Sequence, residues 1–95
     1  MFGTQQKPRV AVFRSNRYLF VQVIDDEKRV TLLGQSDRLL KQTNKLERAK
    51  ALGILLAQEL IKKQLKEALF DRSGYTYHGR VKAVAEGLRE GGIKL

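Results

Sequence analysis

The stretch FDRSGYTYHGRV, residues 70–81, holds several side chains able to bind an anion within a few residues of one another. Arg72 and Arg80 provide fixed positive charge and forked donors that match phosphate oxygens or the edge of guanine. Tyr75 and Tyr77 offer flat faces to a base or ribose, and hydroxyl groups to phosphate. A short strand is expected before this stretch and a helix after it, and loops in that position commonly bind anions. The pattern predicts an anion-binding loop, but it fits equally well a polar turn whose tyrosines pack at its base.

Catalytic and metal-binding chemistry finds little support. His78 is the only histidine and the chain has no cysteine, whereas a metal site needs several ligands. Ser73 and Asp71 have no spacing that matches a catalytic triad. A two-metal nuclease would need converging carboxylates, and nothing in the sequence places Asp25 and Asp26 beside Asp71. We therefore expect no enzyme and no cofactor, with His78 in a structural or RNA-contacting role.

The composition indicates a polyanion-binding protein. The 95 residues carry a net charge of +9, with an isoelectric point near 10.2. Residues 1–24 contain four basic side chains and no acidic one. The absence of cysteine fits a reducing compartment, and no apolar run approaches membrane-spanning length, so we expect a cytoplasmic protein without a membrane partner. A basic protein that is merely soluble remains the alternative at this point.

Three strands are expected first, at residues 9–14, 17–24 and 29–34, joined by short polar turns into an antiparallel meander. Residues 17–24 are apolar on both faces, which predicts a strand covered on both sides. Residues 36–43 are ambiguous, with one helical turn possible at 37–41.

The longest helix is expected to begin at Asn44, which forms a capping box with Glu47. Its apolar positions follow helical spacing and predict a core-facing stripe: Leu46, Ala49, Leu52, Gly53, Leu56, Ala57, Leu60 and Ile61. We expect Gly53 to allow close packing against the sheet. The opposite face carries Lys45, Arg48, Lys62 and Lys63, which is typical of a solvated face and also compatible with RNA contact.

A fourth strand at about residues 66–70 and a second helix at 79–90 complete the pattern, and Gly91 and Gly92 end the helix. Residues 93–95 are expected to add a short tail to the sheet. After a short lead, residues 1–8, the sequence predicts one domain, 9–95, of the α/β class. Its order is strand-strand-strand-helix-strand-helix, with two helices packed on a mixed sheet.

Three segments resemble a known family. FDRSGYTYHGRVKAVAEGLREGGIKL resembles the carboxyl-terminal signature of family eighteen of the bacterial large-subunit ribosomal proteins, which binds 5S rRNA. RVAVFRSNRYLFVQVIDD resembles the first hairpin of that family, and NKLERAKALGILLAQELIKKQLKEALFDR resembles its long helix and the strand after it. The resemblance implies a ribonuclease-H-like topology and a structural, non-enzymatic protein of the large ribosomal subunit. The implied partners are 5S rRNA, 23S rRNA and the neighbouring 5S-binding protein of the central protuberance.

Contacts of such a protein are expected mainly with phosphate and sugar. The residues expected to bind RNA are Lys7, Arg9, Arg14, Asn16, Arg17, Arg72, Tyr75, Tyr77, His78 and Arg80. The first hairpin enters this set because that hairpin lies against RNA in the family. A generic basic RNA-binding module outside the ribosome is the alternative function.

One difference from the family concerns the segment before the first strand. Relatives typically carry a longer, strongly basic arm there, whereas here Pro8 follows seven residues with one positive charge. Phosphate contacts strengthen binding through counterion release. The difference predicts weaker and less salt-sensitive 5S rRNA binding than that of a relative with a full arm.

Overall fold

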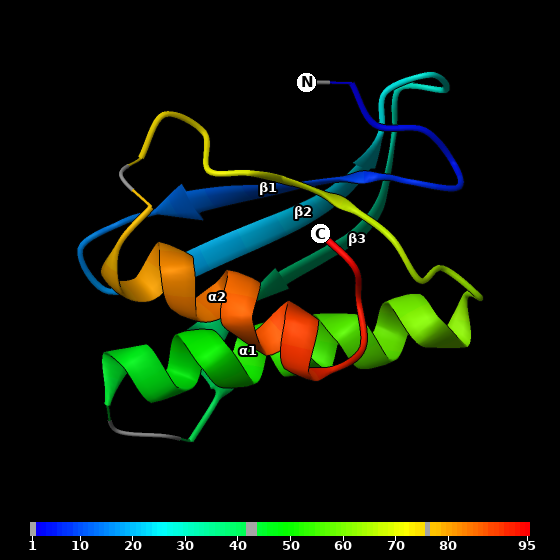
Figure 1. The fold of residues 1–95 in the computed structure, drawn as a ribbon. Helices are drawn as coiled ribbons and strands as arrows, with labels where there is room; N and C mark the ends of the chain where they lie inside the picture. Colours follow the sequence, from blue (N-terminus) through cyan, green and yellow to red (C-terminus); the bar gives the residue numbers. More distant parts are fainter. Residues whose placement is uncertain (1, 42–43, 76) are drawn as a thin grey trace.

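A four-stranded sheet lies on a pair of helices in the computed structural model, which describes residues 2–41, 44–75 and 77–95 (Figure 1). The elements are β1 (Arg9–Arg14), β2 (Leu19–Asp25), β3 (Val30–Ser36), the short 3-10 helix η1 (Asp37–Leu39), α1 (Lys45–Lys62), β4 (Leu69–Asp71) and α2 (Gly79–Glu90). The predicted α/β class and element order are confirmed. The possible helical turn after β3 is η1.

The strand order is β3-β2-β1-β4. The first three strands form the expected antiparallel meander, in which Arg9 pairs with Ile24 and Arg14 with Leu19. Strand β4 instead runs parallel to β1, with Ala11 opposite Asp71. The sheet is therefore mixed, and β1 and β4 both end at the same edge of it.

The tail of the chain returns to the sheet. Gly92 adopts a φ of 103°, a left-handed conformation that glycine accepts without strain, and this turns the chain out of α2. Lys94 then pairs with the segment before β4: its N–H donates to Lys66 O (2.8 Å), and its carbonyl accepts from Ala68 N (3.0 Å). The expected tail is confirmed as this bridge, and β4 itself is shorter than predicted.

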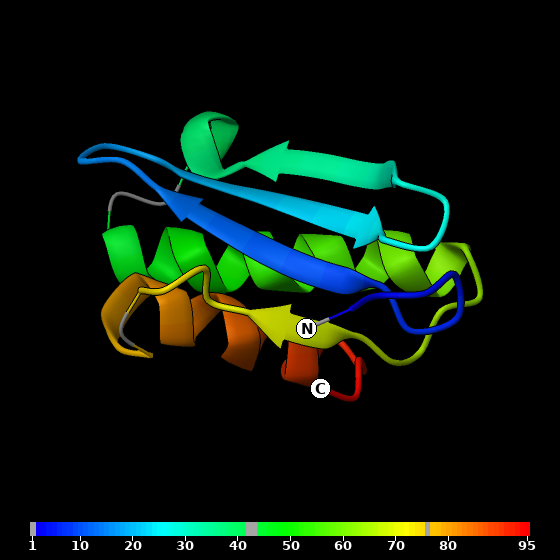
Figure 2. The same ribbon diagram turned by 90° about the horizontal axis from the view of Figure 1, so that it is seen from above.

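Only one face of the sheet carries helices among the described elements (Figures 1 and 2). In β2 the residues Leu19, Val21 and Val23 are fully buried against the helices, while Phe20 on the other face is 40% exposed. The prediction that this strand is covered on both sides was therefore wrong. The second apolar face of β2 therefore lies outside the core that the sheet forms with the helices.

The helices meet through glycine. An added Cβ at Gly53 would lie only 2.3 Å from the Val84 carbonyl oxygen and 2.9 Å from Leu88 N, and Gly87 faces Gly53 in the same way. Gly53 thus allows close packing on α2, and the expectation that it packs against the sheet was wrong. The stripe of α1 is otherwise buried as predicted, except at its ends, where Leu46 and Ile61 are half-exposed.

The contact between Gly53 and α2 makes a testable prediction. Glycine to alanine ordinarily stabilises a helix interior by up to about 1 kcal/mol. Here Gly53→Ala should instead lower the free energy of unfolding by about 1–3 kcal/mol, because the methyl group meets backbone atoms that cannot move aside singly. Urea unfolding followed by circular dichroism measures the change. Gln58→Ala, on the exposed side of α1, is the control; a stabilised Gly53→Ala variant would contradict the close contact.

Candidate nucleic-acid interface

The β1–β2 hairpin ends in a tight polar turn. Ser15 N donates to Tyr18 O (2.9 Å), and Tyr18 N donates to the Ser15 hydroxyl (3.1 Å). This closure leaves Arg14, Asn16 and Arg17 exposed around the turn. The β1–β2 turn therefore presents two guanidinium groups and an amide to solvent.

The predicted loop lies against this turn because β1 and β4 end at the same edge of the sheet. Arg80, in the first turn of α2, donates to Ser15 O (2.7 Å) and more weakly to Arg17 O (3.5 Å). The Tyr75 hydroxyl accepts from Arg14 N (3.1 Å), and the Arg14 guanidinium lies 5.0 Å from the centre of the Tyr75 ring. Two segments about sixty residues apart in sequence thus form one surface.

The loop itself turns through two left-handed residues, Ser73 (φ 54°) and Gly74 (φ 83°). Asp71 closes it, since its Oδ1 accepts from Ser73 N (2.8 Å), and Tyr75 N donates to Arg72 O (2.9 Å). These bonds hold Tyr75 toward the hairpin.

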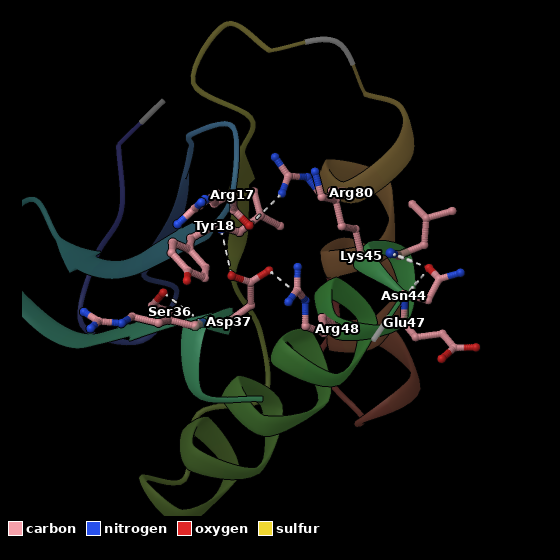
Figure 3. A network of polar contacts seen from close by, with 12 residues as sticks. Arg17, Tyr18, Ser36, Asp37, Asn44, Lys45, Glu47, Arg48 and Arg80 are labelled. Atoms are coloured by element: carbon pink, nitrogen blue, oxygen red, sulfur yellow. Dashed lines mark hydrogen bonds and ion pairs between the residues drawn. The ribbon is translucent and has the colours of Figure 1, made fainter. Parts of the chain in front are cut away.

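The start of α1 adds a third element, as Figure 3 shows. Asn44 caps the helix, with its side-chain oxygen accepting from Leu46 N (2.8 Å) and Glu47 N (3.3 Å). The Lys45 ammonium then donates to Asn16 O (3.1 Å). Lys45, which the sequence assigned to a helix face that is solvated or in contact with RNA, therefore belongs to the same basic surface. We call the set Arg14, Asn16, Arg17, Lys45, Tyr75 and Arg80 the hairpin-edge surface.

A buried carboxylate lies beneath the hairpin-edge surface. Asp37 is fully buried; its Oδ1 accepts from Leu19 N (2.9 Å), and its Oδ2 lies 4.0 Å from Arg48 Nε (Figure 3). Within the described part of the chain, neither of these last two atoms has a hydrogen-bond partner. Asp37 thus joins β2, η1 and α1 just below the β1–β2 turn. Sequence reasoning missed it, because an acid in a short connection looks like an ordinary surface residue.

The remaining predicted residues lie elsewhere. Tyr77 packs edge-on against Phe70, with ring centres 6.2 Å apart, and its hydroxyl accepts from Arg89 (3.0 Å). Together with Arg72 it lines a separate hollow of about 480 Å³. His78 precedes α2, makes no side-chain capping bond to that helix, and lines a groove of about 440 Å³ between α1 and α2.

Lys7 and Arg9 lie at the start of β1, whose other end leads into the hairpin-edge surface. Arg9 is held by two acids: its Nε lies 2.9 Å from Asp26 Oδ2, and its second guanidinium branch lies 2.8 Å from Asp71 Oδ2. The hydrogen bond from Arg9, with one from Gly3 N, holds the pKa of Asp26 below its usual value. The Ser73 N–H, and then Arg9, do the same for the pKa of Asp71, while both acids raise the pKa of Arg9. These bonds give Arg9 a structural role.

The same contacts bear on the nuclease alternative. Asp26 and Asp71 both accept hydrogen bonds from Arg9, a proximity that the sequence did not reveal, so a guanidinium group lies between the two carboxylates. Asp25 is buried and accepts from the N–H groups of Glu27 and Lys28. Within the described residues, no three His, Cys, Asp or Glu side chains gather as a metal site.

The fold and the hairpin-edge surface together indicate the class of protein. This is a small, strongly basic α/β domain whose exposed arginines gather at one sheet edge, as in structural nucleic-acid-binding proteins. Neither α1 nor α2, both fully within the described ranges, is long and apolar enough to cross a membrane.

Comparison with known proteins identifies the family. The model of the family "Ribosomal L18 of archaea, bacteria, mitoch. and chloroplast" matches residues 1–95. The chain is 49% identical to the large ribosomal subunit protein uL18 of Bacillus cytotoxicus, over 98% of this chain and 81% of that one. It is 44% identical to the protein of the same name from Thermotoga neapolitana, over 100% and 83% of the two chains. The chain belongs to this ribosomal protein family, whose members are structural and not enzymes.

Asp37 supplies a prediction about stability. Asp37→Ala removes the acceptor of Leu19 N and leaves Arg48 without its nearest acid, so it should lower the free energy of unfolding by about 2–4 kcal/mol. Asp37→Asn keeps an oxygen for Leu19 N and should lose less. Thermal and urea unfolding compare the two variants; equal losses would show that the bond to Leu19 contributes little.

The Arg9 ion pairs supply a prediction about pH. Because the folded pKa values of Asp26 and Asp71 lie below the ordinary 3.8, the unfolded state takes up more protons in acid. Their stabilising contribution is therefore present above about pH 4 and is lost as the pH falls through the lowered folded values. Arg9→Met should flatten this acid dependence, which in the parent reflects at most about two protons.

Unfolding midpoints measured from pH 6 to pH 2 test this, with Lys50→Met as the control. That variant removes an exposed pair, Lys50–Glu90, which joins α1 to α2. An unchanged acid slope in Arg9→Met would contradict the assignment.

Proposed function

We propose that this chain binds 5S rRNA through the hairpin-edge surface and helps attach it to 23S rRNA in the central protuberance of the large ribosomal subunit. The family supports a role in the large subunit, because the relatives are named large ribosomal subunit protein uL18. The resemblance noted in the sequence supports 5S rRNA as the RNA. The neighbouring 5S-binding protein is the expected protein partner.

The convergence of the β1–β2 turn with the 72–80 loop is the observation that carries the proposal. Arg14 and Arg17 present exposed guanidinium groups, which match phosphate oxygens in bidentate geometry. Arg80 donates to the backbone of the same turn, and therefore acts mainly by fixing its shape. A pre-shaped basic edge is suited to reading the form of an RNA backbone rather than its sequence.

The other sequence-predicted residues divide by position. Asn16, Tyr75 and Arg80 belong with the two arginines in the proposed interface. Arg72, Tyr77 and His78 flank it, and we propose them as secondary contacts. Lys7 is exposed at the far end of the sheet, and we leave Arg9 out of the proposed surface because its guanidinium group is paired with Asp26 and Asp71.

The proposal predicts a specific loss of affinity. Arg14→Ala with Arg17→Ala should weaken 5S rRNA binding by about tenfold or more, and should reduce the slope of log affinity against log salt by roughly 1–2. Filter binding at several salt concentrations, with tRNA as competitor, measures both quantities. Lys62→Ala with Lys66→Ala removes the same charge far from the turn and is the matched control. An equal loss of 5S rRNA affinity in the control variant would show that the arginines act only through non-specific charge, and would contradict the proposed interface.

A further inference from the structure

We propose that the uncovered face of the sheet binds an unpaired RNA base by stacking on Phe13 and Phe20. The inference rests on the proposed RNA-binding function and extends it from phosphate contacts to the kind of RNA element that is held. It begins from the two apolar rings that the fold does not bury.

Phe13 and Phe20 form a direct cross-strand pair between β1 and β2. Paired residues point to the same face of a sheet, and here the neighbours Val12 and Val21 point into the core. The two rings therefore stand on the face opposite the helices, where they are 43% and 40% exposed. Scattered exposed apolar residues are ordinary, but two adjacent aromatic rings on an open sheet face form a flat apolar platform.

The ring of Phe20 extends toward β3. Its outer atoms Cζ and Cε2 would lie 3.3 and 3.9 Å from a Cβ placed on Gly34, which has no side chain to stand beside the ring. The Phe20 ring therefore lies over the bare backbone of Gly34, which continues the flat surface toward β3. The opposite end of this sheet is already closed, because Gly3 lies against Arg9 and Ile24 there. Access is therefore greatest at the hairpin end.

Charge favours RNA over a protein as the occupant. Every charged residue from position 8 to position 24 is basic, and Arg17 lies in the exposed turn that joins the two strands carrying the rings. Arg38, also exposed, follows Ser36, the β3 partner of Phe20. A flat apolar surface bordered by cations matches a nucleotide, whose base is flat and whose phosphate is anionic.

The occupant must be an unpaired base. In an RNA duplex the faces of the bases are already stacked on one another. A base is therefore free to stack on the phenylalanine rings only in a loop, in a bulge or at an end of the RNA. The hairpin-edge surface would then hold the backbone while the adjacent platform receives a base from the same strand.

A tryptophan reporter tests the platform directly, because the chain contains no tryptophan. Phe20→Trp keeps a flat ring, and its fluorescence should be quenched by single-stranded oligoadenylate of about twelve nucleotides. A duplex of the same length should leave the emission nearly unchanged. Val30→Trp, at the far end of β3 on another exposed apolar position, is the control reporter. Equal quenching by both RNAs, or at both positions, would overturn the proposal.

Affinity for 5S rRNA provides the second test. Phe13→Leu with Phe20→Leu keeps apolar side chains but removes both rings, and should weaken binding by about tenfold, while Phe20→Tyr should bind as the parent does. An aromatic pair can also stabilise the hairpin itself, so unfolding is measured alongside. A less stable leucine variant with parental 5S affinity would show a structural role only and overturn the proposal.

The outcomes separate this inference from the proposed function. If the arginine variants lose 5S affinity and the leucine variant does not, the platform fails and the proposed function stands. If the parent shows no preference for 5S rRNA over tRNA but the Phe20→Trp reporter is still quenched by single strands alone, the proposed function fails and the platform stands. Parental RNA affinity of the leucine variant with impaired incorporation into large subunits would overturn the platform and assign the face to a protein partner.

Discussion

The parallel pairing of β4 with β1 is the constraint on which the hairpin-edge surface depends. It spans three residue pairs, Arg9–Leu69 to Ala11–Asp71, and the Arg9–Asp71 ion pair and the tail at Lys94 reinforce it. Because the strands run in the same direction, β1 leads into the β1–β2 turn and β4 into the 72–80 loop at one edge of the sheet. An antiparallel β4 would have sent the tyrosines and Arg80 to the opposite end of the molecule.

Most of the fold was predictable because its signals are local. Periodic apolar residues identified both helices, the Asn44 cap marked the start of α1, and polar turns divided the meander. The wrong predictions concern which element, if any, packs against a given face of a strand or helix. The apolar positions of β2 could not reveal that one face is left open, and helical spacing puts Gly53 on a buried face without saying whether α2 or the sheet lies against it.

The candidate site was predictable in its residue types but not in its grouping. Arg14, Tyr75 and Arg80 lie together at one edge of the sheet. Arg9 has the same side chain as Arg14, but it forms ion pairs with Asp26 and Asp71. Sequence alone does not distinguish an arginine offered to a ligand from one neutralised within the fold, because the difference depends on which acids the topology brings near. The importance of Asp37 likewise follows only from burial.

The bond between Arg80 and Ser15 joins residues 65 positions apart, and the bond between Tyr75 and Arg14 joins residues 61 apart. Contacts of such long range carry a larger loop-closure entropy and tend to form late in folding. During synthesis the hairpin emerges long before its partner loop, so a nascent chain displays the arginines of the turn without the support that shapes them. The hairpin-edge surface therefore takes its final form only after the chain has been made and folded as far as α2.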